Sequence, residues 1–104
     1  MKWQELHSFV AVAEEESFTG AARRLGVSQP EVSRRVRQLE RQVGAKLVQR
    51  TTRQVTITAA GREVLRWALG TIDSWERVNR RLDGYRDDDG PRRSDAIDTD
   101  PDQK

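Results

Sequence analysis

A signal that ends one helix and a signal that begins the next lie almost side by side near residue 26. Gly26 suits the left-handed conformation that stops a helix, and Ser28 is a preferred cap for a following helix. Pro30 falls in the first turn, where an amide hydrogen is dispensable, and Glu31 is expected to reach back to the cap. The sequence therefore predicts two helices joined by a tight turn.

Apolar residues at helical spacing predict three helices around this turn. The first is expected to end near Glu15 and carries Trp3, Leu6, Phe9, Val10 and Ala13. The second, capped by Ser17 or Thr19, carries Phe18, Ala21, Ala22 and Leu25. The third, which stops at Gly44, carries Val32, Val36, Leu39 and Val43. With 104 residues, of which 35% are hydrophobic, the chain is long enough for one small core.

The third predicted helix has two contrasting faces. On a helical wheel with Val32 at zero, the apolar stripe clusters near zero, and Ser33 lies at the flank, at roughly 100°. A polar set lies roughly 140 to 200° away and consists of Pro30, Arg34, Arg37 and Arg41. One side of the helix is thus suited to a core and the other to a polyanion.

A hairpin and a long helix are expected after the third helix. Residues 46–50 and 55–58 are short β-branched or apolar runs, and the turn between them carries Thr51, Thr52, Arg53 and Gln54. Thr58 can cap a helix from Ala59 to about Leu82, stopped by Gly84. Such a helix is roughly 36 to 39 Å long at about 1.5 Å per residue, too long for a small domain to cover.

The net charge of +2 is unevenly distributed along the chain. Residues 17–62 hold 10 Lys and Arg but only two acids, Glu31 and Glu40. Residues 87–104 hold 3 basic and 7 acidic residues and almost no apolar ones, so an acidic, disordered tail is expected over 85–104. A polyanionic partner is expected for the basic body of the chain.

Several functional classes find little support in the sequence. The chain has no cysteine, which excludes disulfides and thiolate metal sites, and its one histidine, His7, flanks the first stripe without a triad or metal pattern. There is no glycine-rich phosphate loop, and no apolar stretch suits a signal peptide or a membrane span. We therefore expect no enzyme activity, no cofactor, no metal and no membrane association, and a cytoplasmic, nucleoid-associated location.

Short polar groups and arginines at the start of a helix are suited to the major groove of DNA. Gln29 can bind adenine in a bidentate manner and Arg34 can bind guanine, with Ser28 and Ser33 beside them. Arg37 and Arg41 are expected at phosphates. In the hairpin, the expected contacts are Arg50, Thr51, Thr52 and Arg53, with Arg53 entering the minor groove.

Each of these assignments has a plainer alternative. The arginines opposite the apolar stripe can merely solvate a surface helix, and Arg53 can be an ordinary turn residue. For Pro30 and Glu31 the roles of helix starter and cap are favoured over contact with DNA. The order of short helix, tight turn, basic helix and basic hairpin favours DNA binding over these alternatives.

With these residues placed, the chain up to about residue 85 resembles the DNA-binding domain and linker helix of LysR-type transcriptional regulators. The first part of the match comprises Phe9 to Glu14, Ser17-Phe18-Thr19, Ala21-Ala22 and Leu25 to Pro30. The second comprises Val32-Ser33-Arg34, Leu39-Glu40, Arg50 to Arg53, Thr58 and Ala60-Gly61. Val48 and Val43 are conservative departures from the phenylalanine and leucine common in the family.

The resemblance implies a winged helix-turn-helix, a symmetric dimer and operator DNA with half-sites. It carries DNA contacts over to Gln29, Pro30, Ser33, Arg34 and Arg53. The family's large effector-binding domain has no counterpart in the match, so no small-molecule effector site is expected in this chain.

The long helix carries a second apolar stripe, which we expect to pair with another copy of the chain. The predicted dimer interface consists of Leu65, Leu69, Ile72, Trp75, Val78 and Leu82. Ala68 lies on the same line and Trp67 lies off it. The alternative is that this stripe packs wholly on its own domain.

Together these observations predict a mainly α protein. A winged helix-turn-helix of three helices and a two-stranded wing is expected over 1–58, a linker and dimerisation helix over 59–84, and the acidic tail over 85–104. The predicted function is sequence-specific binding of double-stranded DNA as a homodimer that regulates transcription. The rival is a protein-interaction role, in which the winged helix faces a partner protein or the chain forms mixed dimers with full-length relatives.

Overall fold

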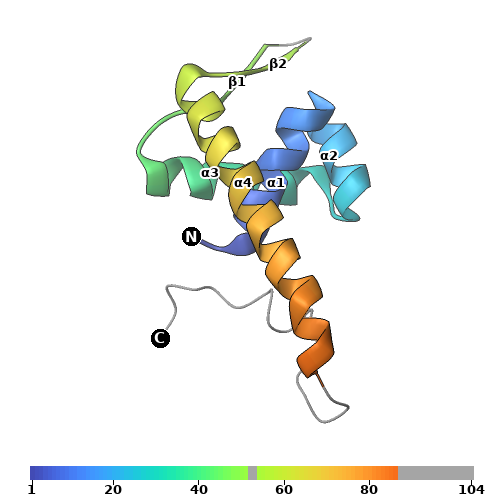
Figure 1. The fold of residues 1–104 in the computed structure, drawn as a ribbon. Coiled ribbons are helices and arrows are strands. Elements are labelled where there is room, and N and C mark those ends of the chain that lie inside the picture. Colours follow the sequence, from blue (N-terminus) through green and yellow to red (C-terminus); the bar gives the residue numbers. More distant parts are fainter. Residues whose placement is uncertain (52–53, 87–104) are drawn as a thin grey trace.

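The helix-turn-helix and the wing form in the order that the sequence predicts. In a computed structural model, which describes residues 1–51 and 54–86, α1 (Trp3–Glu15), α2 (Phe18–Leu25) and α3 (Gln29–Val43) precede a two-stranded antiparallel sheet. The strands are β1 (Val48–Arg50) and β2 (Val55–Ile57), and they are followed by α4 (Ala59–Leu82) and a short 3-10 turn, η1 (Asp83–Tyr85). Figure 1 shows α4 leaving the body of the domain as a projecting rod.

Side-chain caps begin three of these helices at the expected residues. The Ser17 hydroxyl accepts a hydrogen bond from the Gly20 amide at 2.9 Å, so Ser17 and not Thr19 caps α2. Thr58 caps α4 in the same way, through the Gly61 amide at 2.9 Å. The helix ends at Leu82 as predicted, but the predicted stop at Gly84 is wrong, because the chain continues as η1 and Gly84 has no left-handed backbone.

The core lies where α1, α2 and α3 meet the first half of α4 and the base of the wing. Its largest fully buried apolar side chains are Phe9, Leu6, Leu39, Leu47, Val12 and Val32. The prediction that Val43 belongs to the buried stripe of α3 is wrong, since 44% of this residue is exposed. At the last turn of α3 the neighbours Met1, Val64 and Trp67 leave an open groove rather than a filled core.

The start of the wing is fastened to α3 by the carboxylate of Glu40. Glu40 Oε2 accepts hydrogen bonds from the amides of Leu47 at 2.9 Å and Val48 at 3.3 Å, just before and at the start of β1. The sheet pairs Val48 with Ile57 and Arg50 with Val55, so the strands are shorter than predicted. Because Glu40 belongs to α3, the wing has a fixed starting point relative to that helix.

The apolar stripe of α4 is divided between its own domain and solvent. Ala68 is fully buried, and Leu65 and Ile72 pack partly buried against the core. Trp75 lies edge-on to Trp3 of α1, with ring centroids 6.4 Å apart. The far half of α4 nevertheless projects from the domain, and the extents with this helix are 49 × 25 × 25 Å. Among the described residues, none of the helices has the length and apolarity to cross a membrane.

The start of α4 passes so close to the wing that only glycine fits. A Cβ atom on Gly61 would lie 2.2 Å from the carbonyl oxygen of Leu47 and 2.6 Å from Cγ2 of Ile57. By contrast, a Cβ atom on Gly70, later in the same helix, would meet nothing within 4 Å. The two glycines therefore form a natural pair for comparison.

We expect Gly61→Ala to destabilise the fold by about 1 to 3 kcal/mol, because the wing must move away from α4. Gly70→Ala is the matched control and should stabilise the fold by about 0.5 to 1 kcal/mol through helix propensity. Urea unfolding followed by circular dichroism measures both free energies. Equal stability of the two variants would contradict this account of the contact between wing and helix.

Candidate nucleic-acid interface

The amino end of α3 is open to solvent and is built by the tight turn. The Ser28 hydroxyl accepts from the Glu31 amide at 3.2 Å and so starts the helix, while Val27 closes α2 through the Ala22 carbonyl. Ser28, Gln29 and Pro30 are all exposed. Gln29 is steadied by a hydrogen bond at 3.4 Å from Thr19, at the start of α2.

Three arginines continue this polar end along the outer face of α3. Arg34, Arg37 and Arg41 are exposed, while Val32, Val36 and Leu39 on the opposite face are buried. Arg37 also lines a cleft of about 560 Å³ between α3 and the wing, together with Lys46 and Arg50. Lys46 was missed as a candidate site residue, because its place beside Arg37 depends on how the wing folds back.

Arg50 ties the wing to both helices of the helix-turn-helix. Its guanidinium carbon lies 3.6 Å from the ring centroid of Phe18 in α2, and one of its nitrogens donates to the Ser33 hydroxyl of α3. Ser33 itself is only 8% exposed. Both residues were predicted to contact DNA, and their mutual contact gives them in addition a part in orienting the wing.

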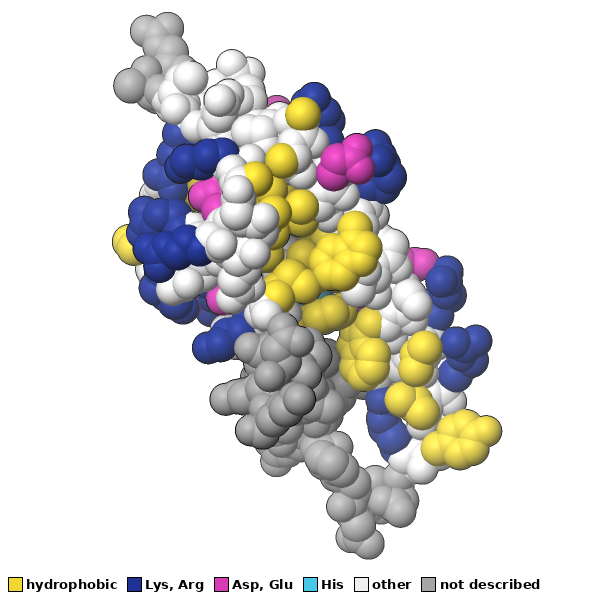
Figure 2. All heavy atoms as spheres, turned by 90° about the vertical axis from the view of Figure 1, so that its left-hand side faces the viewer, with side chains coloured by type: hydrophobic (Ala, Val, Ile, Leu, Met, Phe, Trp, Pro, Cys, Tyr) yellow, Lys and Arg dark blue, Asp and Glu magenta, His cyan; other side chains and the backbone are white. Residues whose placement is uncertain are grey.

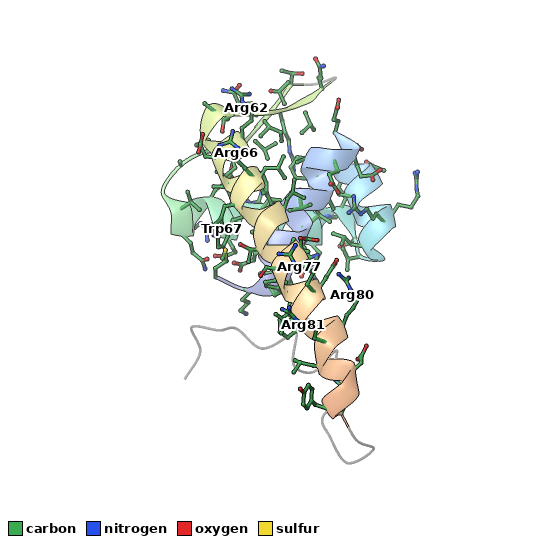
Figure 3. All side chains as sticks on the ribbon, in the orientation of Figure 1. Arg62, Arg66, Trp67, Arg77, Arg80 and Arg81 are labelled. Carbon is green, nitrogen blue, oxygen red and sulfur yellow. The ribbon has the colours of Figure 1, made fainter. Side chains whose placement is uncertain are left out.

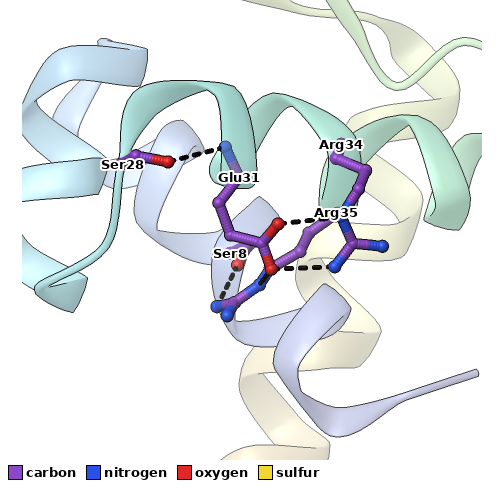
Figure 4. Close-up of polar contacts among 5 residues, drawn as sticks. All are labelled: Ser8, Ser28, Glu31, Arg34 and Arg35. Atoms are coloured by element: carbon purple, nitrogen blue, oxygen red, sulfur yellow. Dashed lines mark hydrogen bonds and ion pairs between the residues drawn. The ribbon is translucent and has the colours of Figure 1, made fainter.

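Glu31 does not make the capping contact expected of it. Its amide donates to Ser28, but its carboxylate turns away and accepts two hydrogen bonds from Arg34, both at 2.8 Å, and one from Arg35 at 3.0 Å (Figure 4). Two guanidinium groups bind a carboxylate more strongly than a neutral amide does, which explains the difference. The hydrogen bonds from Arg34, followed by those from Arg35, lower the pKa of Glu31 to about 2.

Hydrogen bonds join Thr51 and Gln54, the described residues on either side of the wing tip. The Thr51 amide donates to the Gln54 carbonyl at 2.9 Å, and the Gln54 amide donates to the Thr51 hydroxyl at 3.0 Å. Thr52 and Arg53 lie outside the described residues, so their contacts with DNA stay predictions.

The single histidine lies away from this face, between α1 and α4. The ring of His7 is 5.2 Å from that of Trp3, and burial is the main cause that lowers its pKa. Within residues 1–51 and 54–86, no three carboxylate, histidine or cysteine side chains gather in a way that suits a metal ion. The environment of His7 is consistent with a packing role.

Comparisons with known proteins agree with this geometry. The family model of bacterial regulatory helix-turn-helix proteins of the lysR family matches residues 3–62. The uncharacterized HTH-type transcriptional regulator YnfL of Escherichia coli is 52% identical over 82 residues, which are 76% of this chain and 28% of that protein. For the HTH-type transcriptional regulator TfdT of Cupriavidus pinatubonensis the identity is 44% over 81 residues, 78% of this chain and 36% of the relative.

A solved structure shares the arrangement of helices and wing. The crystal structure of the CbnR DNA-binding domain in complex with DNA has a TM-score of 0.77 at 35% identity, covering 82% of this chain and 98% of that one. The chain spans about a third or less of the length of the two curated relatives, and both are named as transcriptional regulators, in agreement with the prediction that it is not an enzyme. The lysR-family match over residues 3–62 and the winged helix-turn-helix around α3 show that the chain belongs to the LysR family of bacterial regulatory helix-turn-helix proteins.

Proposed function

We propose that this chain binds double-stranded DNA in a sequence-specific manner, as the DNA-binding part of a dimeric transcriptional regulator. The observation that carries the proposal is the two-sided α3, whose apolar side is locked in the core while its outer side presents Gln29, Arg34, Arg37 and Arg41 to solvent. The major groove of DNA accepts a helix presented in this way. The DNA in the CbnR complex adds support from a relative of the same fold.

Direct base contacts are assigned to the amino end of α3. Gln29 and Arg34 reach base edges there, with Ser28, Pro30 and Ser33 close by, because this end of a recognition helix enters the groove first. Arg37 and Arg41, further along the helix, contact phosphates, as does Lys46 at the base of the wing. The wing residues Arg50, Thr51, Thr52 and Arg53 complete the interface along the neighbouring backbone and minor groove.

The dimer part of the proposal rests on apolar side chains that α4 leaves uncovered. These side chains, called the α4 stripe, are Trp67, Val78 and Leu82 together with Tyr85 of the following η1. Trp67 is 50% exposed, Leu82 38% and Tyr85 85%, whereas Val78 is partly exposed. Figure 2 shows apolar side chains gathered in a band from the domain body along one side of the long helix. A second copy is a fitting occupant, because a two-fold pairing covers both stripes at once and doubles the basic face.

The α4 stripe differs from the predicted interface in its membership. Leu65, Ile72 and Trp75 are engaged at least in part within their own domain, so Val78 and Leu82 are the predicted interface residues that belong to the α4 stripe. Leu69 is 42% exposed, but it lies on a different face of the helix from Trp67. Trp67 was set aside in the prediction because it lies off the line of the stripe, and it is half exposed. Figure 3 shows Arg62 and Arg66 near the wing end of α4 and Arg77, Arg80 and Arg81 along its far half, so basic residues flank the stripe.

Selection of bound sequences from a random pool of duplex DNA tests the DNA-binding proposal. We expect a two-fold consensus, and we expect Arg34→Ala to lower discrimination at one position by about tenfold through loss of a bidentate base contact. Arg41→Ala should instead weaken binding to all sequences and make the salt slope shallower by about one unit. Absence of any enrichment would overturn sequence-specific binding and favour a protein-interaction module.

Replacement of Leu82 by Glu tests the dimer without touching the core. The variant places a carboxylate in the proposed interface, and we expect the dimer dissociation constant to rise at least about tenfold. Arg81→Gln is the matched control, because it changes the net charge by the same amount at the adjacent exposed position. Sedimentation velocity measures the assembly, and a Leu82→Glu dimer as tight as the wild type would contradict this interface.

A further inference from the structure

Glu31 places a negative charge beside the arginine that is assigned to a base edge. On a surface that approaches phosphates, an unpaired carboxylate would weaken binding to every sequence. In this chain the carboxylate is shared by Arg34 and Arg35, one on each side, and it is held ionised by them with a pKa of about 2. Because the Glu31 carboxylate takes no part in capping α3, its place on this surface calls for another role.

The hydrogen bonds use one edge of the Arg34 guanidinium and leave another free. Glu31 Oε1 accepts from Nε of Arg34, and Oε2 accepts from Nη2. A guanidinium carries five N–H donors in a rigid plane, so the end edge formed by Nη1 and Nη2 still has donors to give. No residue in the described parts of the chain accepts from Nη1 of Arg34, and Figure 4 shows that end pointing away from Glu31.

Glu31 is in turn anchored to the body of the domain. Arg35 donates to Glu31 Oε2 at 3.0 Å and to the Ser8 hydroxyl of α1 at 3.5 Å. Its side chain is only 15% exposed, whereas the side chain of Arg34 is 53% exposed. The exposed guanidinium of Arg34 is therefore connected, through Glu31 and Arg35, to a partly buried support.

We propose that Glu31 is a specificity-determining residue that holds Arg34 by its Nε–Nη2 edge and presents the Nη1–Nη2 edge to a guanine. This inference rests on the proposed function. A side chain already held in its binding orientation loses less freedom when it meets the O6 and N7 acceptors of guanine. The same carboxylate offsets the charge of Arg34, so random duplexes gain less from it at their phosphates. Both effects widen the gap between the correct site and other DNA.

The pairing with Arg34 can be tested in the free protein. We expect the Glu31 carboxyl carbon to titrate near pH 2 in nuclear magnetic resonance spectra, and to return toward the ordinary value of 4.5 in Arg34→Ala. Because folding lowers this pKa, the stabilisation by Glu31 is complete above pH 4.5 and is lost as the pH falls toward 2. An unchanged titration in Arg34→Ala would show that Arg34 is not the partner.

The specificity role is tested with Glu31→Gln in the full chain, titrated with a selected duplex and a random duplex at several salt concentrations. We expect tighter binding to the random duplex, a salt slope steeper by about one unit, and a specificity ratio lower by about tenfold. Glu63→Gln is the matched control, since Glu63 also pairs with an arginine three residues later, Arg66, on an exposed stretch of α4. That control should leave the specificity ratio unchanged.

The double variant Glu31→Gln/Arg34→Ala shows whether Glu31 acts through Arg34. We expect it to match the specificity ratio of Arg34→Ala alone, because the residue that Glu31 positions is then gone. If Glu31→Gln, like Glu63→Gln, leaves the ratio of the affinities for the selected and random duplexes unchanged, Glu31 contributes only charge. The inference then fails, while DNA binding stands. If the wild-type chain itself shows no sequence preference, the proposed function fails first and the inference falls with it.

Discussion

The burial of one face of α3 is the constraint on which the rest of the structure depends. Val32, Val36 and Leu39 are almost fully buried against α1 and α2, and this fixes the rotation of α3 about its own axis. Because that rotation is fixed, the opposite face of α3 points to solvent, and this face carries Arg34, Arg37 and Arg41. The outward direction of the arginine face is thus a consequence of the core, and the contacts with Glu31 then set how the guanidinium of Arg34 is held.

A second layer of contacts orients the wing relative to α3. Glu40 holds the start of β1, Arg50 reaches back to Phe18 and Ser33, and Gly61 lets α4 pass close to the carbonyl of Leu47. These contacts come from four different elements, with Glu40 and Gly61 acting at the base of the hairpin and Arg50 at the end of β1 next to the tip. They turn a short two-stranded sheet, which is barely stable alone, into a fixed arm beside the recognition helix.

Local signals made most of the fold predictable from the sequence. The caps at Ser28 and Thr58 and the glycine stop at Gly26 involve only residues close in sequence, so the sequence pattern alone predicts them. The same holds for the stripe of α3, except for Val43, whose exposure depends on how far α4 reaches. A helical wheel shows which residues share a face but not which neighbours cover that face.

Competition between partners decides those contacts of the site that the local sequence pattern leaves open. Glu31 has a backbone amide within reach in the sequence pattern, and only the folded arrangement of Arg34 and Arg35 shows which partner wins. Trp75 is likewise predicted at the interface with another copy, and the fold adds a contact with Trp3 of its own domain. Amide perturbations in a duplex titration followed by nuclear magnetic resonance test the central claim most directly. The account predicts changes concentrated in residues 28–37 and 46–51, and changes confined to the outer side of α1 or the far half of α4 would contradict it.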